Sequence, residues 1–207
     1  MKRALAFAIC LVLALVCSPS AAQQKYALGV FHYNLQYVAG GMLGFWAIPN
    51  AELDLDNDAM EDLIITESFS PVIDLYEKHP SWGVDIELQG YFLDALAARH
   101  PTVLAKLRKL AKSGQIDVVS FHYSDQLFIA YPAESWRRSQ ALTQATFTKY
   151  DIPLSRTVFC QEGQAGEALA PRMNELGYRN MIWPKNLWSY QHGDEPAEPL
   201  YAFGDIF

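Results

Sequence analysis

The sequence predicts an α/β fold built on parallel strands, because helical and extended patterns alternate along the chain with short links. Residues 101–112 carry an apolar stripe at helical spacing, and residues 116–121 follow directly as an extended apolar run. The same pair recurs in the helical residues 167–176 and the extended residues 178–183. This order favours a parallel sheet or a (β/α) barrel.

The remaining elements are assigned by the same criteria. Pro101 suits a first helical turn, and Gly114 and Gly177 suit the position just past a helix end. Ser70 is predicted to open a helix. Apolar runs predict strands at 27–32, 82–87 and 157–161, with a partial strand at 200–207, and apolar spacing predicts helices at 71–78, 90–99 and 135–150.

Composition narrows the class of protein. Of the 207 residues, 51% are hydrophobic and 19% are charged, which indicates a globular chain rather than a disordered one. The net charge is −7, and loss of Lys2 and Arg3 with a leader would leave 14 basic residues against 23 acidic ones. Nucleic-acid and anionic-membrane binders need a basic surface, so neither partner is expected.

Residues 1–22 have the pattern of a secretory signal peptide. A basic start is followed by the uncharged apolar run 4–16, which is too short to span a bilayer, and then by the small residues Ser20 and Ala22. Cleavage after Ala22 would start the mature chain, residues 23–207, in the periplasm or outside the cell. Lipid attachment at Cys17 is the alternative, and Val16 stands where a small residue is normally needed.

Cys160 would be the only cysteine of the mature chain, so no internal disulfide is expected. We interpret it as a buried thiol in a strand rather than as a nucleophile. The acidic residues 52–62 begin like a calcium loop, but Ala59 replaces the required glycine and Ile65 the closing glutamate. We therefore interpret that stretch as a solvated loop.

Side chains that could bind a ligand follow several predicted strands. Active sites of parallel α/β folds lie at the carboxyl ends of strands. Carboxylates, amides, imidazoles and aromatic rings recur at these ends and suit a polyhydroxylated ligand. The candidate site residues are His32, Asn34, Gln36, Glu87, Tyr123, Asp125, Glu162 and Trp183.

Three segments also resemble glycoside hydrolase family 57. They are Asp-Ile-Glu-Leu-Gln-Gly-Tyr-Phe-Leu at 85–93, Gly-Gln-Ile-Asp-Val-Val-Ser at 114–120, and Phe-Cys-Gln-Glu-Gly at 159–163. The resemblance implies a distorted seven-stranded (β/α) barrel, and in that family the catalytic nucleophile is a glutamate, here Glu162. Capping of a helix near Gly166 is the structural alternative for this carboxylate.

The sequence departs from the family in two ways. The first signature, His-x-His-Gln-Pro, reads His32-Tyr33-Asn34-Leu35-Gln36, so that Asn34 replaces the second histidine. A retaining glycosidase needs a second carboxyl group, and the family's downstream aspartate has no clear equivalent because Asp205 follows too closely. Asp125 and Glu87 are the substitutes at strand ends. We expect a barrel that is incomplete at its C-terminus, as in a fragment of a longer protein.

We therefore expect an exported retaining glycoside hydrolase or transglycosidase that acts on a poly- or oligosaccharide, with Glu162 as nucleophile and without a cofactor. The first alternative is a non-catalytic sugar-binding or assembly protein on a degenerate barrel. The second is a zinc-dependent polysaccharide deacetylase, although no His-x-x-x-His pair occurs and Asn34 is a poor zinc ligand. The glycan and the oligomeric state remain open.

Overall fold

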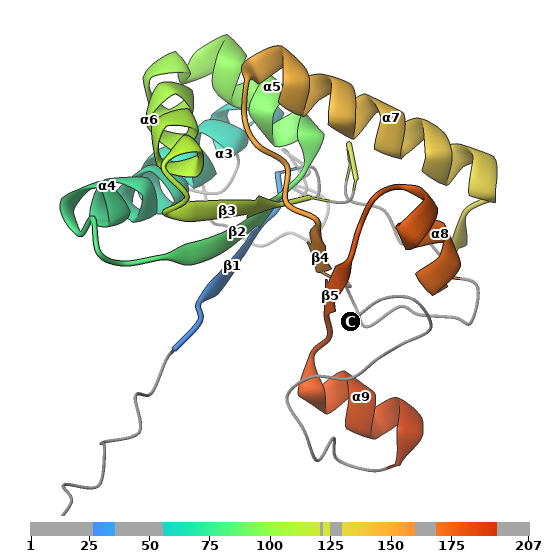
Figure 1. Cartoon of the computed structure of the whole chain (residues 1–207). Helices are drawn as coiled ribbons and strands as arrows, with labels where there is room; N and C mark the ends of the chain where they lie inside the picture. The colour runs from blue at the N-terminus through green and yellow to red at the C-terminus, as the bar shows by residue number, and fades with distance from the viewer. Residues whose placement is uncertain (1–26, 36–55, 121, 125–129, 160–168, 194–207) are drawn as a thin grey trace, which may run out of the picture.

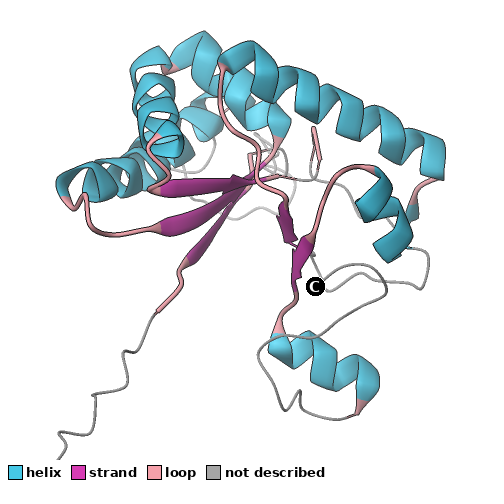
Figure 2. Cartoon of the chain, in the orientation of Figure 1, coloured by secondary structure: helices cyan, strands magenta, loops and turns pink. Residues whose placement is uncertain are grey.

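The computed structural model describes residues 27–35, 56–120, 122–124, 130–159 and 169–193. Within these ranges, parallel strands are covered by helices on one face (Figures 1 and 2). One sheet has the order β1-β2-β3, and a second pairs β4 with β5. The strands are β1 (Val30–Tyr33), β2 (Val84–Leu88), β3 (Ile116–Val119), β4 (Thr157–Phe159) and β5 (Asn180–Ile182).

The strands follow one another in chain order. The backbone N–H of Ser155 donates to the carbonyl of Val118 at 2.9 Å, which joins the approach to β4 to the edge of β3. A doubly wound sheet reverses its strand order partway, whereas a barrel adds each strand beside the last. The prediction of a parallel α/β fold is confirmed. The described residues contain five strands, so a complete seven-stranded barrel stays a prediction.

Alternation along β2 separates the two faces of the sheet. Val84, Ile86 and Leu88 are buried in the main hydrophobic core with residues of the covering helices, whereas Glu87 points to the opposite face. The main core also takes side chains from α4 (Ser70–Lys78), α5 (Gly90–Arg99), α6 (Pro101–Lys112) and α7 (Ala133–Tyr150). A smaller cluster joins β4 to α8 (Leu169–Glu175) and to Trp136 of α7.

Helix ends agree with the local signals where those signals are strong. The helices predicted at 90–99 and 101–112 have the observed bounds, and Gly114 has a φ of 77° just beyond the second helix. The helix predicted at 135–150 begins two residues earlier, at Ala133. A helix that the pattern did not indicate, α9 (Lys185–His192), follows β5.

The loop predicted for residues 52–62 is wrong in its second half. Asn57–Ile64 form helix α3, and the Asp56 carboxylate caps it by accepting from the N–H of Ala59 at 2.8 Å. The chain continues without a break from α3 through the π-helix η2 (Ile65–Phe69) into α4. Ser70 therefore does not open a new helix, contrary to the prediction.

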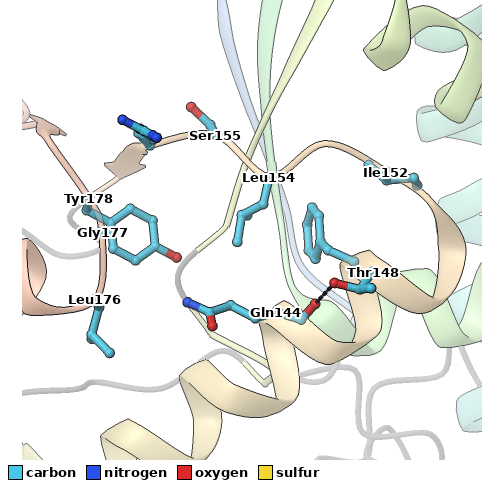
Figure 3. Close-up of a pocket in the computed structure, with 10 residues that line it drawn as sticks. Gln144, Thr148, Ile152, Leu154, Ser155, Leu176, Gly177 and Tyr178 are labelled. Carbon is cyan, nitrogen blue, oxygen red and sulfur yellow. Dashed lines mark hydrogen bonds between the residues drawn. The ribbon is translucent and has the colours of Figure 1, made fainter.

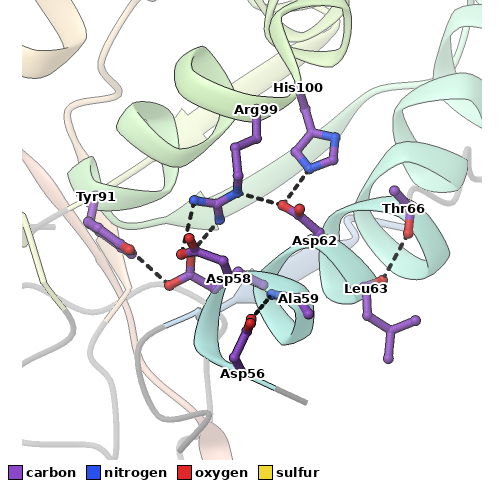
Figure 4. A network of polar contacts seen from close by, with 10 residues as sticks. Asp56, Asp58, Ala59, Asp62, Leu63, Thr66, Tyr91, Arg99 and His100 are labelled. Carbon is purple, nitrogen blue, oxygen red and sulfur yellow. Dashed lines mark hydrogen bonds and ion pairs between the residues drawn. The ribbon is translucent and has the colours of Figure 1, made fainter. Parts of the chain in front are cut away.

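Helix α3 is held by the end of α5 (Figure 4). The Arg99 guanidinium contacts Asp58 at 3.4 Å, Asp62 at 2.6 Å, and the buried carboxylate of Glu61. His100 shares the Asp62 oxygen at 2.8 Å. Arg99 therefore takes the place of solvent around the buried carboxylate of Glu61, and it pairs with Asp58 and Asp62, which remain in contact with solvent.

In the part of the chain that the structure describes, no helix is both long enough and apolar enough to cross a bilayer. The expected signal peptide, Cys160 and the partial strand at 200–207 lie outside the described residues.

Candidate functional site

A histidine and a glutamate meet on the face of the first sheet that the described helices leave uncovered. His32 of β1 is the register partner of Glu87 of β2, and its Nδ1 hydrogen-bonds the Glu87 carboxylate. Glu87 is buried, whereas the His32 side chain keeps 35% of its surface exposed. The pair therefore presents an imidazole to solvent and holds a carboxyl group behind it.

Burial sets the protonation of this pair. Loss of hydration raises the pKa of Glu87, and the hydrogen bond and charge of His32 oppose that rise without cancelling it. Glu87 therefore retains a proton more readily than an exposed glutamate. An imidazole that faces solvent against such a carboxyl group can donate to, or accept from, a hydroxyl group of a ligand.

The His32 ring also meets a residue from the second sheet. Its centroid lies 5.6 Å from that of Phe159, on β4, and the ring planes are tilted by 37°. β2 and β3 lie between β1 and β4, which follows β3 through the Ser155–Val118 hydrogen bond, so this contact requires the strands to curve toward the face that the described helices leave uncovered. His32, Glu87 and Phe159 consequently lie on one concave surface.

Two amides lie one step further along the same strands. Asn34 is half-buried just after β1, and Gln89 follows Glu87 by two residues, which places it on the same face. Gln89 is 1% exposed, and neither atom of its amide has a hydrogen-bond partner among the described residues. A buried amide of this kind costs free energy unless a further group satisfies it.

Tyr123 is directed elsewhere. Its hydroxyl donates to Asp94 of α5 at 3.0 Å, and the Tyr150 hydroxyl of α7 reaches the other carboxylate oxygen at 2.5 Å. Gly90 permits this packing, since a Cβ there would lie 2.9 Å from the Tyr123 ring. The structure thus brings His32 and Glu87 together and places the Tyr123 hydroxyl at the junction of α5 and α7.

The other candidate residues divide by location. Trp183 directly follows β5 and is half-buried. Gln36, Asp125 and Glu162 lie outside the described residues, so their part in the site stays a prediction.

Two site residues were not selected from the sequence, Phe159 and Gln89. Gln89 could have been found from the period of two that begins at Glu87. Phe159 could not, because its contact with His32 depends on the curvature of the sheet.

His122 is the remaining strand-end histidine. It is 2% exposed, and burial lowers its pKa from 6.5 to about 3, so the ring is neutral at ordinary pH. Among the described side chains, no three His, Cys, Asp or Glu residues lie close enough to hold a metal ion.

A cavity of about 360 Å³ lies apart from these residues, between α7 and the segments that lead into β4 and β5. Gln144 and Thr148 line it from α7, and Leu154 and Tyr178 line it from the other side (Figure 3). It opens where β4 and β5 begin, whereas His32 and Glu87 lie toward the carboxyl ends of their strands. The cavity is therefore separate from the candidate site.

The fold is glycoside hydrolase-like. It is similar to the crystal structure of a 4-alpha-glucanotransferase from Thermococcus litoralis, with a TM-score of 0.62 and 18% identity, over 76% of this chain and 22% of that one. In sequence, 65 residues are 31% identical to Alpha-amylase 1 of Dictyoglomus thermophilum, which is 31% of this chain and 10% of the amylase. No family model matches the chain. The chain thus spans only a small part of each of these relatives.

Proposed function

We propose that this chain acts on poly- or oligosaccharides as a retaining glycoside hydrolase or transglycosidase. The observation that carries the proposal is the pair of His32 and Glu87 on the concave face, beside the ring of Phe159. An imidazole and a carboxyl group can bind sugar hydroxyls, and an aromatic ring packs against the apolar face of a sugar. The fold shared with a glucanotransferase and the segment shared with an amylase make an α-glucan the first substrate to test.

In this proposal Glu162 is the nucleophile. It comes three residues after Phe159 in the sequence, and Phe159, the last residue of β4, contacts His32. The carboxylate would attack the anomeric carbon while a second carboxyl group, about 5–5.5 Å away, protonates the leaving oxygen. The raised pKa of Glu87 suits a proton donor, and Asp125 is the other candidate for that role.

The decisive substitution is Glu162→Gln, which keeps the size and hydrogen-bonding reach of the side chain but removes the attacking anion. Turnover of maltoheptaose by the full chain, followed by chromatography, should fall by several orders of magnitude. Glu134→Gln is the matched control, because Glu134 is an exposed helical acid that pairs with Arg137 and Arg138. The anomer first released by the unchanged chain should have the configuration of the substrate.

A helix-capping role for Glu162 predicts a different result. The substitution would then cost about 1 kcal/mol of stability and leave turnover unchanged. Melting curves of the unchanged chain and of Glu162→Gln distinguish a helix cap from a nucleophile. Unchanged turnover of the variant would exclude Glu162 as the nucleophile.

The second candidate function is non-catalytic sugar binding. Among the described residues, Glu87 supplies the carboxyl group beside the His32 imidazole, and that carboxyl group is already hydrogen-bonded to His32. A carboxyl group engaged in this way is less available as a catalytic acid, which favours binding without turnover. In that case, maltoheptaose would bind to the full chain without turnover, and His32→Ala would weaken the binding.

A further inference from the structure

A stacked pair of rings is exposed beside the amino-terminal end of β2, the central strand of the first sheet. His79 and Trp82 lie in the connection between α4 and β2. Figure 1 shows that connection at the left. Their ring centroids are 4.2 Å apart and their planes differ by 14°. Trp82 is 49% exposed, although the Tyr76 ring also contacts its indole at a centroid distance of 6.5 Å and an angle of 72°.

The connection that bears these rings is built rigidly. The N–H of Trp82 donates to the carbonyl of His79 at 2.9 Å, which closes a four-residue turn with Pro80 at its second position. The Gln115 amide donates to the carbonyls of Tyr76 at 2.5 Å and His79 at 3.0 Å. The backbone that carries the indole is thus held by its own turn and by Gln115, and the ring itself stacks on His79. This order reduces the conformational entropy that would be lost when a ligand packs on the indole.

We propose that the Trp82–His79 stack is a second carbohydrate-binding site, at which one pyranose ring packs on the solvent-exposed part of the indole. The apolar C–H face of a sugar matches a flat aromatic face in size. The exposed side chains of His79 and Ser81 supply N–H and O–H groups beside it for the hydroxyl rim. A specific protein partner would need about 800 Å² of surface, far more than one indole provides.

This site would hold a polymer rather than process it. It adjoins the start of β2, whereas His32 and Glu87 lie toward the carboxyl ends of their strands. A glucan held at the stack would remain near the concave face after each turnover, which raises the effective concentration of substrate there. That the polymer held at the stack is an α-glucan rests on the proposed function.

The test is affinity electrophoresis of the full chain in native gels with and without soluble starch. Trp82→Ala should weaken the apparent affinity about three- to tenfold, the loss expected for one aromatic packing contact. Trp82→Phe should keep part of the affinity. Tyr190→Ala is the matched control, since Tyr190 is a more exposed aromatic residue on α9, and it should leave the affinity unchanged.

Each alternative outcome decides against the stack. The inference fails if starch does not retard the unchanged chain. It also fails if starch retards the Trp82→Ala variant as strongly as it retards the unchanged chain. It also fails if Trp82→Ala instead converts a dimer to a monomer in analytical ultracentrifugation, because the stack would then be a contact between copies.

The two proposals fail separately. A chain that starch retards through Trp82 but that never turns over maltoheptaose would keep the stack and lose the proposed enzyme activity. Turnover of maltoheptaose without any dependence of starch binding on Trp82 would do the reverse.

Discussion

At the scale of single residues, the buried imidazole of His122 ties stability to pH. The folded protein keeps this ring neutral down to about pH 3, whereas the unfolded chain takes up the proton near pH 6.5. Between these values the unfolded state binds more protons, so His122 lowers the free energy of unfolding as the pH falls.

His122→Gln should therefore flatten the loss of stability on acidification across the window from pH 6.5 to pH 3. Urea unfolding of both proteins at several pH values in that window gives the comparison. Carboxylates titrate in both proteins, so their contribution cancels in the difference between the two free energies of unfolding at each pH. Equal slopes would mean that His122 is charged or solvated in the folded state.

The pair of His32 and Glu87 leads to a prediction about coupling. His32→Ala would leave the Glu87 carboxyl group buried without its partner and should cost about 2 kcal/mol at neutral pH. Glu87→Gln, added to that variant, should recover most of the loss because a neutral amide is cheaper to bury. Chemical denaturation of the four proteins in this double-mutant cycle measures the coupling, and strictly additive effects would contradict it.

At the scale of elements, a helix could be predicted from the sequence when the residues that fix its ends lie within it or beside it. The bounds of α5 and α6 could be predicted because Pro101, Gly114 and the apolar spacing lie within or beside the helices. Helix α3 could not, because its acidic side chains are stabilised by Arg99 and His100, which lie far along the chain. In isolation, the same acidic stretch has the composition of a solvated loop.

The ion pairs of Arg99 with the acidic residues of α3 allow a test of whether distant side chains stabilise this helix. Arg99→Leu should cost about 2–3 kcal/mol, since it leaves the buried carboxylate of Glu61 without its cation. Arg137→Leu is the matched control, because Arg137 pairs with Glu134 on an exposed helix face and should cost less than about 0.5 kcal/mol. Thermal melts give both values, and limited proteolysis should show cleavage within α3 in the first variant alone.

In the candidate site, too, the contacts between residues could not be predicted from local sequence. The strand-end rule selected His32 and Glu87 separately, and the register of β1 on β2 brought them into contact. Tyr123 also follows a strand, but its hydroxyl reaches Asp94 because Gly90 lets the ring pack over the start of α5. Which strand-end residue faces the concave surface depends on packing between distant segments.

At the scale of the whole molecule, the fate of residues 1–22 is a separate prediction. We expect the exported protein to begin at Gln23, because a basic start, a short apolar run and small residues precede it. The intact mass of protein recovered from outside the cytoplasm measures this directly. A mass that includes Met1, or one that includes lipid on Cys17, would contradict the expected cleavage.

The described residues form two separate hydrophobic clusters, and this has a consequence for how the molecule opens. The smaller cluster is formed by Trp136, Val158, Leu169, Ala170, Met173 and Tyr178, so its loss exposes far less apolar surface than loss of the main core. Amide hydrogen exchange should therefore release β4, β5 and α8 at a lower free energy than β2 and β3. Helix α7 places Trp136 in one cluster and Phe147 in the other, so in this partly open state its second half would stay protected while its first half exchanges.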